Sequence, residues 1–111
     1  MATIYRIVSS ADWSAASAGG AFHGSDHDRR DGFIHFSAAH QVAETAAKHY
    51  AGQRELLLVS VSSERLEELL PGALRWEISR GGAAFPHLYA SLPLAAVTRV
   101  EPLPRRDVAV R

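Results

Sequence analysis

Four charged or ionisable side chains stand at positions where their chemistry could serve a ligand. Arg6 lies inside an aliphatic run, His35 inside an aromatic run, Glu77 in an alternating segment, and His87 directly after a proline. A guanidinium can bind phosphate through two parallel hydrogen bonds. An imidazole can donate or accept a proton near neutral pH, and a carboxylate can act as a base. These four positions are therefore our candidates for a binding or catalytic site.

Each candidate also has a structural interpretation. Arg6 could pair with Glu77 or Asp31 on an exposed sheet face, and Glu77 would then be an ion-pair partner. His35 could be a half-buried histidine that bonds a neighbouring backbone group. For His87, the Gly-rich, proline-fixed loop that we expect before it favours function, because functional side chains concentrate on such loops. The functional interpretation requires Arg6, His35 and His87 to line one cleft.

Other motifs give little support to common enzyme classes. The sequence contains no GxSxG, Walker-type, HExxH or GxGxxG pattern, so hydrolase and nucleoside-triphosphatase activities lack their usual signatures. His23 and His27 stand four residues apart, with Asp26 and Asp28 nearby, which is a conceivable surface metal site. Because this segment is rich in Gly and Asp, we expect these side chains to be solvated and expect no metal.

Composition limits the choice of partners. The chain has 111 residues, 12 basic and 12 acidic side chains, and no cysteine. The balanced charge makes nucleic acid an unlikely partner, and the lack of cysteine excludes thiol catalysis and disulfides. No apolar stretch approaches the roughly 20 residues of a membrane span, and no signal pattern opens the chain. We expect one cytoplasmic domain over residues 1–111, with 104–111 as a frayed tail and no membrane partner.

The elements that must position the candidates centre on residues 31–37. Phe33, Ile34 and Phe36 favour a short strand, which an Asp-Gly turn begins. Ser37 then has the residue type that caps the helix expected over residues 38–50. A strand that runs directly into a helix start makes an edge suited to ligands, and His35 lies next to it.

The rest of the chain predicts an α+β fold. Residues 19–32, rich in Gly, His, Asp and Arg, are long for a connection and predict a binding loop or lid. Trp13 is expected in the core. We expect small antiparallel or mixed sheets that form a cleft, with two to three short helices. The expected strands are 3–8, 55–61 (mid-sheet), 74–79 and 97–103, and the further helices are 10–18 and 62–70, with one helical turn at 93–97.

Four runs of this sequence resemble a known family. They are Asp31–Ser37, Gln41–Ala43, Arg75–Glu77 and Phe85–Tyr89, and on them the chain is identified as a member of the bacterial family called domain of unknown function 952. The resemblance covers nearly the whole chain. That family is in turn similar to the ADP-ribosyltransferase-like superfamily, in which two small sheets form a cleft for NAD.

The resemblance implies roles for particular residues. Tyr5-Arg6 resembles the opening of the superfamily's first strand, where an aromatic residue precedes Arg or His, and Ile34–Ser37 resembles the RNA 2′-phosphotransferase branch. It implies NAD as a cofactor, with Arg6 and Tyr5 near the pyrophosphate or adenylate ribose. His35 and Ser37 would contact the nicotinamide ribose or its base.

One position departs from the superfamily's pattern. His87 stands where protein-modifying transferases carry a glutamate. An imidazole cannot stabilise positive charge as a carboxylate does, so Glu77 would have to lie in the cleft and replace that glutamate. The phosphotransferase branch works without that glutamate. We therefore expect an enzyme or former enzyme that binds NAD or a related nucleotide and transfers ADP-ribose or a 2′-phosphate-type group. The alternative is a non-catalytic small-ligand or protein-interaction module with a structural His/Arg/Glu network.

Overall fold

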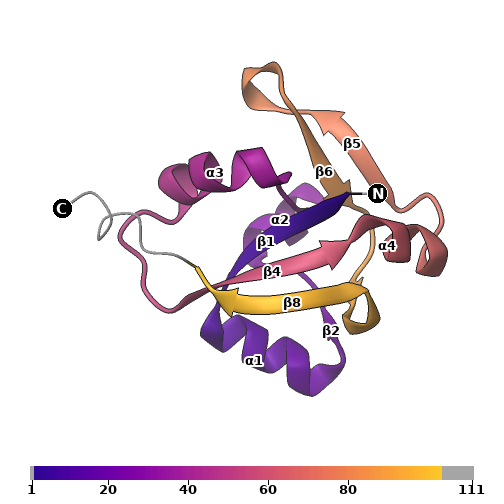
Figure 1. Cartoon of the computed structure of the whole chain (residues 1–111), viewed down its shortest axis with the longest axis horizontal. Helices are drawn as coiled ribbons and strands as arrows, with labels where there is room; N and C mark the ends of the chain where they lie inside the picture. The colour runs from indigo at the N-terminus through magenta and orange to yellow at the C-terminus, as the bar shows by residue number, and fades with distance from the viewer. Residues whose placement is uncertain (1, 104–111) are drawn as a thin grey trace.

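The computed structural model describes residues 2–103, apart from the side chain of Arg80. The first of its sheets has three strands (Figure 1). The order is β1-β4-β8, and both pairings are antiparallel. The apolar run expected in the middle of a sheet is indeed its central strand. The strands are β1 (Thr3–Ser9), β4 (Leu56–Ser62) and β8 (Val97–Pro102).

Two further small sheets complete the strand arrangement. One has the order β3-β6-β5 and the other pairs β2 with β7, so every strand pairing within residues 2–103 is antiparallel. Tyr5 and Ser37 exchange two backbone N–H···O bonds of 2.8 Å, which join β1 to the segment after β3. The strands are β2 (Ala21–Phe22), β3 (Ile34–His35), β5 (Leu74–Ile78), β6 (Ala84–Leu88) and β7 (Leu92–Pro93).

In the described part of the chain, four α-helices connect these strands where two or three were predicted. They are α1 (Ser10–Gly19), α2 (Asp26–Asp31), α3 (Val42–His49) and α4 (Ser63–Leu69), with short 3-10 turns at Ala39–Gln41, Arg80–Gly82 and Leu94–Ala96. The additional helix is α2, which lies inside the segment expected to be a loop or lid. The structure also shows that Asp31 ends this helix instead of beginning a turn into the strand.

A capping box explains why α2 forms. The Ser25 hydroxyl accepts the backbone N–H of Asp28, and the Asp28 carboxylate accepts the backbone N–H of Ser25. Gly32, with φ of 88°, then ends the helix in the left-handed conformation that glycine adopts without strain. These two ends fix the helix in a segment whose composition resembles a loop.

The start of α3 differs from the prediction that Ser37 caps it. The hydroxyl of Ser37 lies 3.0 Å from that of Thr45, and the α-helix begins only at Val42, after a 3-10 turn. Gln41 secures this start, because its side-chain oxygen accepts the N–H of Ala38. Its amide nitrogen donates to the carbonyl of Ala84 on β6, so α3 is tied to the second sheet.

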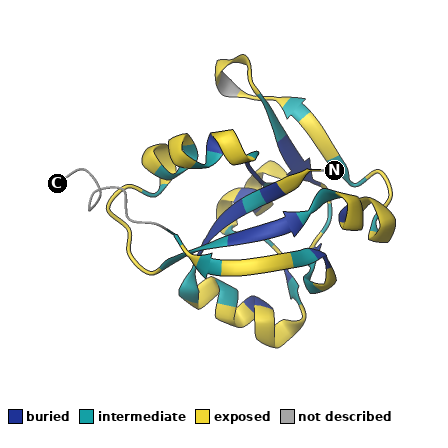
Figure 2. Cartoon of the chain, in the orientation of Figure 1, coloured by how far each residue is buried: buried dark blue, intermediate teal, exposed yellow. Residues whose placement is uncertain are grey.

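The core of the described residues is a cluster of buried apolar side chains. It includes Ile4 on β1, Val59 on β4 and Leu88 on β6, so it connects the first sheet to the second. Trp13, predicted in the core, is only half-buried and packs against this cluster. Figure 2 shows β1 mostly buried and β4 divided between buried and half-buried residues, whereas much of β5 is exposed.

His87 lies on a strand and not after a loop as predicted. It belongs to β6, the middle strand of its sheet, and is opposite His35 in the register with β3. The two candidate histidines are therefore cross-strand neighbours.

Within residues 2–103, no helix is long and apolar enough to cross a membrane. The predicted frayed tail, 104–111, lies outside the described residues.

Candidate functional site

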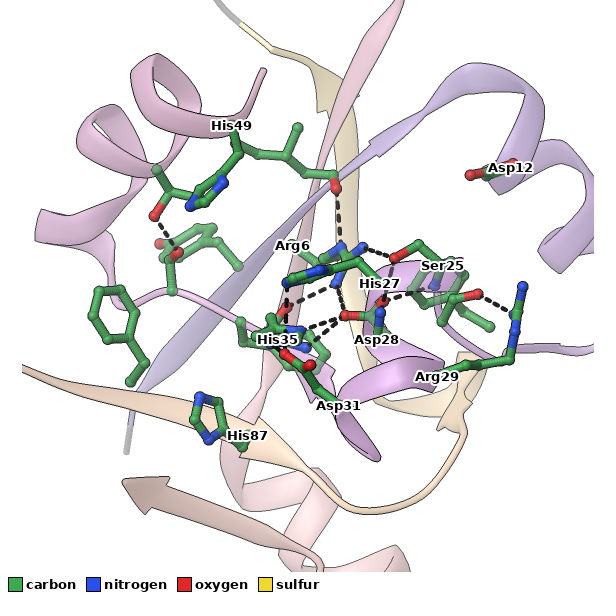
Figure 3. Close-up of a pocket in the computed structure, with 18 of the residues that line it drawn as sticks. Arg6, Asp12, Ser25, His27, Asp28, Arg29, Asp31, His35, His49 and His87 are labelled. Atoms are coloured by element: carbon green, nitrogen blue, oxygen red, sulfur yellow. Dashed lines mark hydrogen bonds and ion pairs between the residues drawn. The ribbon is translucent and has the colours of Figure 1, made fainter. Parts of the chain in front are cut away.

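A groove of about 1090 Å³ is lined by residues of three helices, α1, α2 and α3, and of the strands β1 and β3 (Figure 3). Five of the six site residues predicted from the sequence line it: Tyr5, Arg6, His35, Ser37 and His87. The sixth, Glu77, is not part of the lining. Folding thus brings together side chains from three distant segments of the chain.

Asp28 lies at the centre of this region, although the sequence predicted a solvated side chain there. It is 1% exposed. Its carboxylate accepts hydrogen bonds from Arg6 at 2.8 Å, from Nδ1 of His35 at 2.6 Å and from the His35 backbone N–H at 3.1 Å. Burial by itself would raise the pKa of this carboxyl. The hydrogen bonds from His35 and Arg6 outweigh burial and hold the pKa well below its ordinary value.

Arg6 is buried, with 8% exposure, and pairs with Asp28 instead of Glu77 or Asp31. Its guanidinium also donates to the carbonyls of Ile7 and His35 and to the Ser25 hydroxyl, so four of its five N–H groups have partners. The expected exposed sheet face is therefore wrong for this residue. Arg6 fixes the floor of the groove and has little capacity left to clamp a phosphate.

His35 is half-buried and lies between two carboxylates. Its Nδ1 faces Asp28, and its Nε2 lies 2.9 Å from Oδ2 of Asp31. The ring of His27 stacks on it with a centroid separation of 4.7 Å. His23, which the sequence grouped with His27, instead contacts Ser91 at 2.7 Å. The histidine that joins His27 is therefore His35, which the tertiary fold brings to it.

His87 forms a second polar cluster on the sheet β3-β6-β5. Its Nδ1 lies 2.7 Å from Oε1 of Glu77, which also accepts the hydroxyl of Tyr89 at 2.8 Å. The ring of Phe33 stacks on the His87 ring at 4.0 Å. The hydrogen bonds from His87 and Tyr89 lower the pKa of Glu77, and the bond to Glu77 raises the pKa of Tyr89. Glu77 therefore orients His87 from outside the groove.

We expect the Tyr89→Phe substitution to raise the pKa of Glu77 toward the ordinary glutamate value, because one of its two hydrogen-bond donors is lost. A group whose folded pKa is depressed stabilises the fold above its ordinary pKa, and this contribution disappears as the pH falls through the folded value. Carbon-detected NMR titration of the Glu77 carboxyl in both proteins measures the shift. Identical titration curves would show that Tyr89 does not act on Glu77.

Four residues that form this region were not among the six site residues predicted from the sequence, namely His27, Asp28, Asp31 and Phe33. The sequence analysis considered His27 and Asp28 only as a surface metal site, which it expected to be solvated, and Asp31 only as an ion-pair partner of Arg6. A signal was present for three of them. Ser25 and Asp28 have the spacing of a capping box, and Gly32 follows at the distance of a helix end. A helix predicted over 26–31 would have placed His27 and Asp31 on one face, because residues four apart are neighbours there.

Comparison with solved structures finds close relatives of this fold. The crystal structure of protein CC0527 from Caulobacter crescentus is 51% identical in sequence, with a TM-score of 0.85, and the match covers 92% of this chain and 86% of that one. The solution NMR structure of the same protein is 52% identical with a TM-score of 0.79, over 93% and 85% of the two chains. No curated protein matches the chain.

The family comparison agrees with the motifs that the sequence displays. The model described as "Protein of unknown function (DUF952)" matches residues 7–100, a range that contains α2, β3, α3 and the hairpin of β5 and β6. The predicted membership is therefore confirmed, and the chain belongs to the DUF952 family.

Proposed function

We propose that the groove binds NAD or a related nucleotide. In this proposal the domain has an ADP-ribosyltransferase-like fold and transfers ADP-ribose or a 2′-phosphate-type group. The observation that carries this proposal is that Tyr5, Arg6, His35, Ser37 and His87 line one groove. The volume of about 1090 Å³ is slightly larger than the roughly 300–1000 Å³ of small-molecule sites. It leaves room for an extended ligand.

The burial of Arg6 changes the role that the resemblance gave it. Because Asp28 neutralises its charge, ligand phosphates would have to meet cations at the groove's rim, such as Lys48, whose side chain is 58% exposed, and Arg29. His35 and Ser37 keep the proposed contact with the ribose or nicotinamide. Arg6 then acts as a positioning residue, since its guanidinium holds Asp28 and the His35 carbonyl in place.

His87 has the proposed role of orienting the acceptor, with Glu77 holding its Nδ1. In such a transfer the bond between the ribose C1′ and the nicotinamide nitrogen breaks while the acceptor oxygen or nitrogen bonds to C1′. Nicotinamide leaves as a neutral base when that bond breaks, and the proton of the acceptor passes to solvent. Because Glu77 does not line the groove, the geometry favours the phosphotransferase-like form of this proposal over protein ADP-ribosylation.

Isothermal titration with NAD and with ADP-ribose, in the presence of a chelator, tests the proposal. We expect saturable binding that weakens about tenfold in His35→Ala, because leaving a buried polar group of the ligand without its partner costs about 1–3 kcal/mol. Lys48→Ala should also weaken binding without affecting the core. His40→Ala is the matched control, since this exposed histidine is not part of the groove lining.

Two outcomes would contradict the proposal. The absence of heat with every nucleotide would exclude a nucleotide site, and binding that His35→Ala leaves unchanged would place the ligand elsewhere. A strong fall in melting temperature for His35→Ala, with no nucleotide raising the melting temperature of the wild type, would favour the alternative of a structural network. The contacts of His35 with Asp28 and Asp31 are the observation that supports that alternative.

A further inference from the structure

Three side chains on one wall of the groove have the composition of a transition-metal site. His27, Asp31 and His35 each offer one ligand atom, and these atoms lie within 4.8 Å of one another. Figure 3 shows the three side chains gathered beside Asp28 at the edge of α2. We propose that they bind a divalent transition-metal ion such as Zn²⁺. This site goes beyond the proposed function and does not depend on it.

The spacing of the donor atoms suits such an ion. A tetrahedral zinc ion with ligands at about 2.0–2.1 Å holds its ligand atoms roughly 3.3 Å apart. Oδ2 of Asp31 lies 2.9 Å from Nε2 of His35 and 3.6 Å from Nε2 of His27, so both separations are within half an ångström of that value. The third separation, between the two histidines, is no more than 4.8 Å. Because the two rings are stacked, the exposed ring of His27 would have to turn so that both histidines direct a nitrogen at the ion.

The buried carboxylate behind His35 is an independent observation that points to a metal ligand. Asp28 holds Nδ1 of His35 at 2.6 Å and is itself 1% exposed. A carboxylate that orients a histidine through one ring nitrogen, and leaves the other nitrogen for an ion, is the usual outer shell of a histidine metal ligand. Asp28 and Arg6 therefore fix Nε2 of His35 toward Asp31 before any ion arrives.

The chemistry of the donor set selects the class of ion. Two imidazoles and one carboxylate are found in catalytic zinc sites and in sites for other first-row divalent metals, whereas Mg²⁺ prefers oxygen ligands only. Because all three residues line the groove, the remaining coordination positions of the ion are open to it. An ion held there could polarise a bound ligand or activate a water molecule.

The positive charge of Arg30 disfavours binding of a cation in the present arrangement. One of its guanidinium nitrogens lies 3.4 Å from Nδ1 of His27, and its positive charge is close to the cluster. The guanidinium would turn toward solvent when His27 coordinates. We therefore expect Arg30→Gln to bind the ion more tightly than the wild type, which is a change that a merely structural cluster would not produce.

Isothermal titration of the tag-free, chelator-treated protein with Zn²⁺ alone at pH 7.5 tests the site. We expect one saturable site, at least about tenfold weaker in His27→Ala and in Asp31→Asn. Mg²⁺ should give no comparable binding. His27 and Asp31 are exposed positions, with side chains 60% and 41% accessible, so these variants are expected to fold. His40→Ala controls for nonspecific binding to a surface histidine.

The result that overturns the proposal is Zn²⁺ binding of equal affinity in wild type, His27→Ala and Asp31→Asn, or no saturable binding in the wild type. His35→Gln gives a second check, because it removes the ligand nitrogen and keeps a polar side chain. The titration contains no nucleotide, so its failure would leave the nucleotide proposal standing, and the chelated nucleotide titration is equally independent of the metal.

Discussion

Asp28→Asn is expected to lower the free energy of unfolding by about 3–5 kcal/mol, which is the cost of leaving one partner of a buried ion pair uncompensated. The variant keeps the shape of the side chain but removes the charge that neutralises the Arg6 guanidinium, and both side chains are 8% exposed or less. Small domains have a total stability of about 5–15 kcal/mol, so this is a large share of it. Urea unfolding, followed by tryptophan fluorescence, measures the loss.

A matched control lies on the same helix. Asp26 also pairs with an arginine, Arg29, but its side chain is 91% exposed. Asp26→Asn should therefore cost less than about 1 kcal/mol. A loss of similar size in Asp26→Asn and Asp28→Asn would contradict the central role of Asp28. In the double variant Arg6→Met/Asp28→Asn, the total loss should be smaller than the sum of the single losses, because no unpaired cation remains.

The lowered pKa of Asp28 predicts how the free energy of unfolding depends on pH. Its pKa in the folded protein lies below the ordinary aspartate value of about 3.9, which also describes the unfolded chain. Asp28 therefore contributes fully above about pH 4, and its contribution is lost as the pH falls toward the folded value. Urea unfolding between pH 7 and pH 2 should show a steeper acid loss in the wild type than in Asp28→Asn. Parallel curves would contradict this assignment.

Gly24→Ala is expected to destabilise the fold by about 2–4 kcal/mol, because it combines backbone strain with a steric clash. Gly24 has φ of 95°, and a Cβ built there would lie 2.9 Å from Cβ of Asp28. Asp28 cannot easily move away, since its carboxylate is held by Arg6, His35 and Ser25. The added methyl group therefore clashes with Asp28, the residue at the centre of the candidate site.

Gly52→Ala separates the two causes. Gly52 has a similar φ of 79°, but a Cβ there would meet nothing within 4 Å. We expect it to show the backbone cost alone, about 1–2 kcal/mol. The difference between the two variants then measures the clash with Asp28. If Gly24→Ala and Gly52→Ala unfold at the same urea concentration, the close approach of Gly24 to Asp28 has no energetic consequence.

The sequence alone determined the elements whose patterns depend on local chemistry. The apolar run of β4, the alternation of β5 and the capped leucine-containing helix α4 were predicted at nearly the observed positions, because residue periodicity and capping act over a few residues. The α+β class followed from these elements, whereas the family followed from the four motif runs between Asp31 and Tyr89. The helix α2 was missed because its composition favours a loop, although its capping pair was present.

Only the tertiary structure decided which side chains meet. The partner of Arg6 is Asp28, 22 positions away in the chain, while Glu77 joins His87 across two paired strands. Contacts of this kind depend on strand register and on the packing of α2 against β3, which residue types alone do not specify. The residue types determined which chemical groups are available. The fold determined that Arg6 is buried, where it positions Asp28, and that His27, Asp31 and His35 lie together at one edge of the groove.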